Sequence, residues 1–421
     1  MYRKISLLLI FLMLFTVLTG CYDAVEIDDE VYPVMLGVDK GANNKFRITI
    51  QYSVYGAANR NQEGTQRTQS NIAVIEAPSI IESMEMFGQE ISRRITLKHL
   101  KVIVFSEKIA VEGIEKYILG IQRYREMRNT VAITVVKGEA QNFVRENLSI
   151  IGESLPKMVE LFFSQPLHNS YSAEEQFFDF YQSILSSYKQ PVASYGGVND
   201  YSNIGEGENQ KDIPPITGKG YLPGEIPRKG SAKRELSGTA VFNGDKMVGY
   251  LDSYETRYYL LVEGKFRGAT ITINDKYKPS TVIVAYIKLA RKPKVKAHFS
   301  AGKPVIDVNL KVEADIVSIN NKTPYEKLYM IQDLNAQIKD FLLKGINKTI
   351  EKTQKEYESD IFGFGYHVVD NFKTIQEWED YNWLSHYKDA KINVNLTVNV
   401  RRMGAGFYTS DIWNSGGRVE K

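Results

Sequence analysis

The sequence predicts an α+β protein in which helices cover one face of sheets whose other face meets solvent. Two segments, 306–316 and 392–400, place apolar side chains at every second position. This alternation is typical of strands with one buried and one wet face, and it favours antiparallel over fully buried parallel pairing. Between them, segment 325–358 carries one apolar stripe at helical spacing, and its Leu334 and Phe341 are expected to be buried against a sheet. The stripe consists of Leu328, Ile331, Leu334, Ile338, Phe341, Leu342 and Ile346. One amphipathic helix on one sheet face indicates a layered domain.

The composition is that of a folded globular chain. Of its 421 residues, 43% are hydrophobic and 24% are charged, which excludes an intrinsically disordered or collagen-like protein. Only one stretch is apolar enough to concern a membrane, so a polytopic membrane protein is excluded as well. The formal net charge is +3, without the basic field that binding of nucleic acid requires. A single cysteine excludes an internal disulfide.

The N-terminus predicts a secretory signal peptide over residues 1–20. Arg3-Lys4 precedes an unbroken apolar run from Leu7 to Phe15, which is the charge and hydropathy order of such a peptide. The following Leu18-Thr19-Gly20-Cys21 resembles the lipobox of bacterial lipoproteins. That resemblance implies cleavage before Cys21, a diacylglycerol on its thiol and often an acyl chain on its new amine. A single membrane-spanning anchor is the alternative, but the run is shorter than the ~20 residues that span hydrocarbon.

Residues 31–195 alternate between predicted strands and helices. A β-hairpin is expected over 31–55, with its turn at Gly41-Ala42-Asn43-Asn44. Ser172-Ala173-Glu174-Glu175 has the pattern of a capping box and predicts the start of a helix. The other elements expected here are a helix that opens at Pro78, a buried strand at 100–105, a helix at 107–122, a strand at 130–136 and a helix at 139–147.

The composition changes at residues 196–233, which are rich in Gly, Pro, Ser and Asn and are the best candidate for a domain boundary. Beyond them, Asn243-Gly244-Asp245-Lys246 predicts a second hairpin. A helix at 253–263 and strands at 269–274 and 281–290 follow. The boundaries divide the mature chain into an N-terminal α+β domain (21–195), a linker (196–233), a small middle domain (234–275) and a C-terminal α+β domain with the long helix (276–421).

The sequence contains no catalytic or metal-binding pattern with adequate spacing. Phosphate-binding, zinc-protease, serine-hydrolase and EF-hand motifs are missing. The five histidines lack metal-ligand spacing, and structural or surface roles are the simpler interpretation, with a zinc site built from distant histidines as the alternative. The carboxylate pair Glu174-Glu175 is interpreted as a solvated face or a helix start. We predict no enzymatic activity, no metal and no cofactor, and we favour binding or scaffolding.

Several segments in a fixed order carry a family resemblance. They are Gly20-Cys21-Tyr22-Asp23 with Leu36-Gly37-Val38-Asp39, the run from His99 to Val104 with Gly113-Ile114 and Arg128, the hairpin from Gly238 to Gly249, and Ser359 to Gly365 with Trp383 and the stretch from Val398 to Gly404. Together they resemble the Ger(x)C family, the lipoprotein C subunits of spore nutrient germinant receptors. Tyr22 departs from the tryptophan usual in this family, a change that leaves the lipid site unaffected.

The resemblance implies a three-domain chain of mixed or antiparallel sheets with flanking helices, which acts as a receptor subunit and not as an enzyme. It implies a body anchored through lipid on Cys21 at the outer face of the spore inner membrane. There it would lie beside a polytopic A subunit and a transporter-like B subunit. The family supplies no catalytic residue.

The partner-binding surface is a separate hypothesis. Weak protein interfaces often use aromatic and arginine anchors, so Trp383, Arg401 and Arg402 are the candidate contact residues. The alternative is that Trp383 belongs to the core and the arginines line a wet sheet face. The competing function is a solute-binding lipoprotein that delivers a nutrient to a membrane transporter, and an extracytoplasmic hydrolase is a further alternative. Saturable binding of an amino acid or sugar would favour the solute-binding protein.

Overall fold

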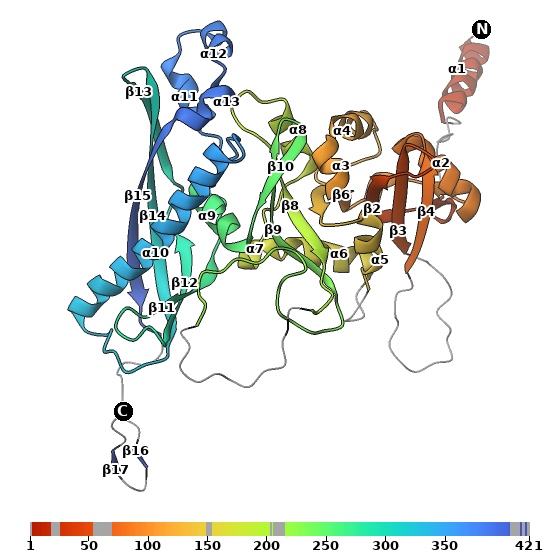
Figure 1. Cartoon of the computed structure of the whole chain (residues 1–421). Coiled ribbons are helices and arrows are strands. Elements are labelled where there is room, and N and C mark those ends of the chain that lie inside the picture. The colour runs from red at the N-terminus through yellow and green to blue at the C-terminus, as the bar shows by residue number, and fades with distance from the viewer. Residues whose placement is uncertain are drawn as a thin grey trace.

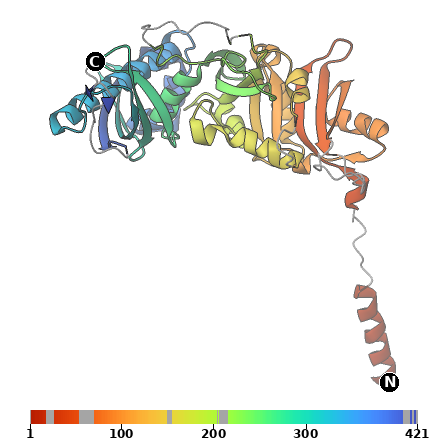
Figure 2. The same cartoon turned by 90° about the horizontal axis from the view of Figure 1, so that it is seen from below.

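The computed structural model describes residues 2–17, 26–53, 70–148, 154–202, 204, 215–404, 413–414 and 417–418. Helix α1 (Tyr2–Val17) comes first, and two sheet-based units then lie side by side in an elongated body (Figures 1 and 2). None of the helices in these ranges has both the length and the apolar character needed to cross a membrane. The predicted α+β class is confirmed by this combination of mixed sheets and packed helices.

An eight-stranded mixed sheet forms the first unit, in the order β10-β9-β8-β7-β6-β2-β3-β4. The three pairs at its centre, β2 with β6, β6 with β7 and β7 with β8, are parallel. The outer pairs are antiparallel. The strands are β2 (Pro33–Lys40), β3 (Phe46–Ser53), β4 (Ser70–Ala77), β6 (Val102–Ser106), β7 (Ala132–Val136), β8 (Val192–Val198), β9 (Arg234–Asn243) and β10 (Lys246–Leu251).

The parallel centre explains the composition of β6. The predicted preference for antiparallel pairing concerned segments 306–316 and 392–400, which belong to the second sheet, and that sheet is mixed. All five residues of β6 are buried, because helices cover both faces of the eight-stranded sheet. Ile103 and Phe105 pack into the cluster that includes α2, α4 and α8, whereas Val102 and Val104 face α5 and α6. The helices of this unit are α2 (Ile80–Ile91), α3 (Glu107–Glu112), α4 (Glu115–Gln122), α5 (Ala140–Arg145), α6 (Leu155–Ser164), α7 (Pro166–Asn169) and α8 (Phe177–Ile184).

Short elements join the N-terminal end of the body to this unit. The 3₁₀ helix η1 (Ile27–Asp29) leads into β1 (Glu30–Val31), which pairs in parallel with β5 (Arg94–Ile95). A second 3₁₀ helix, η2 (Leu97–His99), follows β5. From residue 26, the chain therefore enters the body through η1 and the separate two-stranded sheet of β1 and β5.

Both predicted hairpins are confirmed, as β2–β3 and β9–β10. Gly244 adopts a φ of +62° in the second turn, a conformation that favours glycine. The predicted capping box is wrong, because α8 starts at Phe177 and the Ser172 hydroxyl donates instead to the carbonyl oxygen of Gly238 at 2.7 Å.

A five-stranded sheet forms the second unit. The 17-residue β14 pairs antiparallel with β12 and β13, and in parallel with β15. The strands are β11 (Ala269–Asn274), β12 (Val282–Leu289), β13 (Lys294–Ser300), β14 (Lys303–Ile319) and β15 (Lys391–Arg402). The small elements of this unit and of the chain end are α11 (Gly365–Val368), η3 (Val369–Asn371), α12 (Ile375–Tyr381), α13 (Trp383–His386), η4 (Tyr387–Asp389), β16 (Trp413–Asn414) and β17 (Gly417–Arg418).

The long helix α10 (Leu328–Lys355) packs on β15 and on α9 (Ser253–Glu263) (Figure 1). Four residues of the predicted stripe are buried, and they are Leu334, Ile338, Leu342 and Ile346. Leu328, by contrast, is 78% exposed. Phe341 is half-buried and meets the ring of Tyr254 edge-on, so its expected burial against a sheet is corrected to a contact with α9.

The strands of the predicted middle domain are divided between the two sheets. β9 and β10 belong to the eight-stranded sheet, whereas β11 belongs to the five-stranded sheet. The predicted linker 196–233 connects β8 to its antiparallel neighbour β9. The change in composition therefore falls between two adjacent strands of one sheet.

Candidate interaction site

The predicted site residues do not form one surface. Cys21 lies outside the described residues. Trp383 is on α13, near the start of β15, whereas Arg401 and Arg402 are at the end of that twelve-residue strand (Figure 1). At ~3.3 Å per residue the two ends of β15 are about 35 Å apart, so the tryptophan and the arginines cannot share one small contact patch.

Trp383 is a core residue, with 1% of its surface exposed. Its indole Nε1–H donates to Oδ2 of Asp360 at 2.9 Å, and the other oxygen of Asp360 accepts from the Gly363 N–H at 3.0 Å. Burial raises the pKa of Asp360 to about 6, although these hydrogen bonds favour the carboxylate. The placement corrects the prediction of Trp383 as a partner contact, because a buried side chain offers no surface to a partner.

Arg401 and Arg402 are both exposed. Arg401 donates through Nη1 to Oε2 of Glu313 on the neighbouring β14 at 2.7 Å. That hydrogen bond lowers the pKa of Glu313. Both arginines remain available to a partner on geometric grounds.

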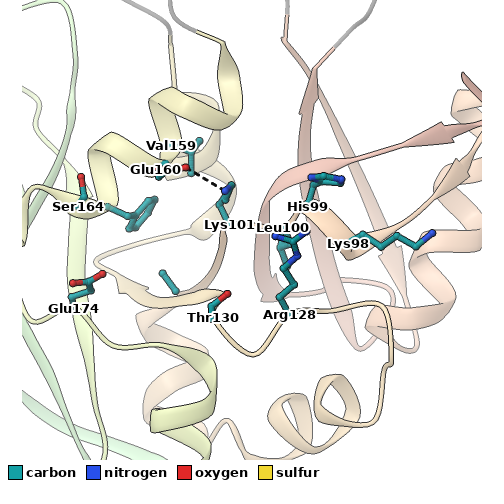
Figure 3. Close-up of a pocket in the computed structure, with 12 residues that line it drawn as sticks. Lys98, His99, Leu100, Lys101, Arg128, Thr130, Val159, Glu160, Ser164 and Glu174 are labelled. Carbon is teal, nitrogen blue, oxygen red and sulfur yellow. Dashed lines mark hydrogen bonds and ion pairs between the residues drawn. The ribbon is translucent and has the colours of Figure 1, made fainter. Parts of the chain in front are cut away.

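A cavity of about 200 Å³ lies between η2, the start of β7 and α6. The cations Lys98, Lys101 and Arg128 contribute to its wall, with His99 among them. In the view of Figure 3, Glu174 and Ser164 lie on the side opposite His99, Lys98 and Arg128. The apolar part of the lining consists of Leu100, Ala132, Val159 and Phe163.

The local fold explains how these groups come together. Thr96 caps η2 by accepting from the Lys98 N–H, which places Lys98, His99 and Lys101 just before the buried strand β6. The apolar face of α6 buries Val159 and Phe163 against the sheet. Glu160 therefore lies on the solvent side of α6, where it faces Lys101.

Ion pairs fix two of the cations, whereas the third has no such partner. Lys101 Nζ lies 3.3 Å from Oε2 of Glu160, and Lys98 Nζ lies 3.2 Å from Oε1 of Glu30. Within the described residues, no ion pair or hydrogen bond engages the exposed guanidinium of Arg128. The cavity therefore contains a free guanidinium that can form paired hydrogen bonds to a carboxylate or phosphate.

His99 packs edge-on against Tyr32, with 4.8 Å between ring centroids. Partial burial lowers the pKa of His99, and the cations Arg128, Lys101 and Lys98 lower it further. The imidazole is thus held in its neutral form near neutral pH. Among the described residues no group of three His, Cys, Asp or Glu side chains could hold a metal ion. The cationic side chains that line the cavity suit recognition of an anionic group such as a carboxylate or phosphate.

Sequence reasoning found part of this cavity and missed the rest. The run from His99 to Val104 and Arg128 were already singled out as segments of family resemblance. The α6 wall was missed, because no expected helix covers residues 155–164. Pro156, in the first turn of α6, and the apolar spacing of Leu155, Val159 and Phe163 are the signals that could have found it.

The described residues thus define an α+β protein with a charged surface cavity and without a metal cluster. Comparison with known families identifies its family. Residues 23–198 match the "Spore germination protein N-terminal domain", and residues 237–404 match "Spore germination B3/ GerAC like, C-terminal". The chain belongs to this family of GerAC-like spore germination proteins, the Ger(x)C family.

Curated relatives match over nearly the whole chain. Spore germination protein YndF of Bacillus subtilis (strain 168) is 22% identical, with 96% of this chain and 97% of the relative covered. Spore germination protein KC of the same organism is 23% identical, with 96% and 97% covered. Spore germination protein GerQC of Bacillus cereus is 22% identical, with 94% and 98% covered. The crystal structure of the GerBC protein aligns with a TM-score of 0.48 and 15% identity over 87% of this chain and 96% of that chain.

Proposed function

We propose that this chain is the lipid-anchored C subunit of a spore nutrient germinant receptor. In this proposal it lies on the outer face of the spore inner membrane and acts by protein–protein contact with the A and B membrane subunits to trigger germination. The observation that carries the proposal is the lipobox-like Leu18-Thr19-Gly20-Cys21 at the start of a member of this family. No enzymatic step is part of the proposed role.

The proposed lipid anchor at Cys21 is close in sequence to the start of the body at Glu26, so the tether between membrane and body would be short. Four residues separate Cys21 from Glu26, the first described residue of the body. The five steps from Cys21 to Glu26 span at most about 18 Å when fully extended. Since η1 continues into β1 beside β5, the separate two-stranded sheet that these strands form would lie close to the membrane surface. Two or three acyl chains at ~0.8 kcal/mol per buried methylene would hold it there stably.

Recovery of the receptor from spore membranes tests the proposal. We expect the tagged full-length chain to co-purify with its A and B subunits after mild detergent extraction, and spores without the chain to lose their nutrient response. Absence of both subunits from the purified material would contradict the proposal. Saturable binding of an amino acid or sugar by the purified chain, without those subunits, would favour the solute-binding lipoprotein instead.

A further inference from the structure

A second cavity of about 350 Å³ adjoins the first. Glu174 lines both cavities, and α6 leads through Gln165 directly into α7, which contributes Pro166 and Leu167 to the second. The opposite wall comes from the end of α9, the turn that follows it and Lys292 between β12 and β13. The two cavities therefore form one groove that takes residues from both family-matched parts of the chain.

The lining of this groove is strongly cationic. Its only acidic residues within the described ranges are Glu160 and Glu174. We call the following set the cationic groove: Lys98, Lys101, Arg128, Lys265, Arg267 and Lys292. Six cations and two carboxylates therefore line the groove. Carboxylates outside the lining compensate two of the cations, since Glu30 pairs with Lys98, and Glu175 and Glu263 pair with Lys265.

Three of the six cations have no anionic partner within the described residues. Arg128, Arg267 and Lys292 are exposed, and no ion pair engages them. They are distributed along the groove, with Arg128 in the first cavity and Arg267 and Lys292 in the second. Free guanidinium and ammonium groups at both ends are arranged to receive more than one anionic group.

A buried ion cluster holds the wall of the second cavity in place. Lys265 Nζ lies 3.4 Å from Oε2 of Glu175 and 3.2 Å from Oε1 of Glu263. Lys189 binds the same oxygen of Glu263. Both carboxylates are buried, and they come from different family-matched parts of the chain. The two halves of the groove are therefore held in a fixed relation before any partner arrives, which lowers the entropic cost of binding.

We propose that the cationic groove binds an acidic, extended segment of a membrane partner subunit. The inference rests on the proposed function and assigns a surface to it. A small anion would engage one end only, whereas spaced carboxylates on an extended chain would engage Arg128 and Arg267 together. The cations lie in hollows with apolar lining such as Phe163 and Phe266. That shape suits inserted side chains better than a flat lipid surface, and arginine anchors beside apolar groups are typical of protein interfaces.

Charge reversal in the full-length chain tests the groove. The test variant combines Arg128→Glu, Arg267→Glu and Lys292→Glu. Its control combines Arg125→Glu and Arg291→Glu, because these arginines are exposed, lie in the loops that contain Arg128 and Lys292, and line neither cavity. Both variants are extracted from spore membranes, and the recovered A and B subunits are quantified at low and high salt. Thermal unfolding of the purified variants checks that they are folded.

We expect the groove variant to recover about tenfold less of at least one subunit at low salt, because reversed charges repel an acidic segment. The control variant should match the wild type. Exchange of acidic residues for lysine in the partner segment should restore recovery by the groove variant.

Two results would overturn the inference. The first is wild-type recovery of both subunits by the folded groove variant. If that variant also binds phosphatidylglycerol vesicles less than the wild type does, the groove is a lipid-binding surface. The second is an equal loss of recovery with the control variant. Failure of the wild-type chain itself to recover either subunit would instead contradict the proposed function, and the groove assignment with it.

Discussion

Trp383 donates its indole N–H to a carboxylate oxygen of Asp360, and both side chains are buried in the five-stranded unit. The same oxygen accepts from the Gly365 N–H at 3.0 Å. A Cβ added at Gly365 would lie 2.6 Å from Cδ1 of Trp383, so the backbone approaches the indole too closely for another residue. The aromatic and the carboxylate together hold the turn that follows α10.

Trp383→Phe should destabilise the chain by about 1–3 kcal/mol, because it leaves a buried carboxylate without one of its donors. Trp378→Phe is the matched control, since the Trp378 indole is also buried but donates to the neutral hydroxyl of Ser187 at 2.9 Å. Urea unfolding at pH 7 should show the larger loss for Trp383→Phe. Equal losses would mean that the bond to Asp360 contributes no more than a neutral hydrogen bond.

Asp360 should make stability depend on pH. Its pKa is about 6 in the folded chain against an ordinary 3.8, so the folded state binds this proton more tightly than the unfolded state. The resulting contribution to stability is full below about pH 4 and is lost as pH rises through 6. Measured from pH 4 to 7, the wild type should lose on the order of 2–3 kcal/mol relative to Asp360→Asn, which does not titrate. A constant difference between the two proteins would contradict the raised pKa.

Leu334→Ala should cost about 2–5 kcal/mol of unfolding free energy through lost burial and a residual cavity. Leu334 is fully buried on α10, in the cluster that contains Val398 and Val400 of β15. Leu328→Ala serves as the control at the exposed start of the same helix and should change stability by no more than about 0.5 kcal/mol. Similar values for the two variants in urea unfolding would mean that the buried face of α10 is assigned incorrectly.

Cys21→Ala should prevent lipid attachment and cleavage at this site. The chain has no other cysteine, so metabolic labelling with a palmitate analogue gives an unambiguous readout. We expect label on the wild type, none on the variant, and an uncut precursor on a gel. Equal labelling of both proteins would exclude lipidation at Cys21.

Arg401→Glu combined with Arg402→Glu tests the surface proposed at the end of β15. The ion pair between Arg401 and Glu313 is exposed, and such pairs typically contribute at most ~1 kcal/mol, so the abundance of the chain should stay close to wild type. If these arginines dock a partner, the nutrient response of the spores should fall. An unchanged response with normal abundance would remove this surface from consideration.

Local pattern was sufficient to predict much of the second unit. The alternation of β14 and β15 and the stripe of α10 depend on neighbours two, three or four residues apart, which the sequence displays directly. The order of the strands does not follow from such patterns. β14 pairs in parallel with β15 across an 86-residue separation at Val305 and Lys391, and no local pattern encodes a pairing of that range.

The candidate site shows the same difference between local patterns, which the sequence displays, and long-range contacts, which it does not display. His99, Lys101 and Arg128 stood out in the sequence as parts of a motif. Glu175 was interpreted as a solvated face or a helix start, yet it is buried because Lys265, 90 residues later, compensates its charge. The capping-box pattern fails because no helix starts directly after Ser172, whose hydroxyl donates to Gly238 on a distant strand, and α8 begins only at Phe177. For both Glu175 and Ser172, the environment of the side chain depends on a residue that is distant in the sequence.

The adjacency of β8 and β9 restricts how this family can exchange parts. The two family-matched regions meet inside a continuous sheet, with β8 at the end of one and most of β9 at the start of the other. A chimera that joins residues 23–198 of one relative to residues 237–404 of another would place two unrelated strand edges side by side. It would also have to recreate the Lys265–Glu175 pair across the seam. Recombination between paralogues should therefore succeed more often when the crossover lies beyond both β10 and Lys265 than when it lies in the Gly/Pro-rich segment 196–233.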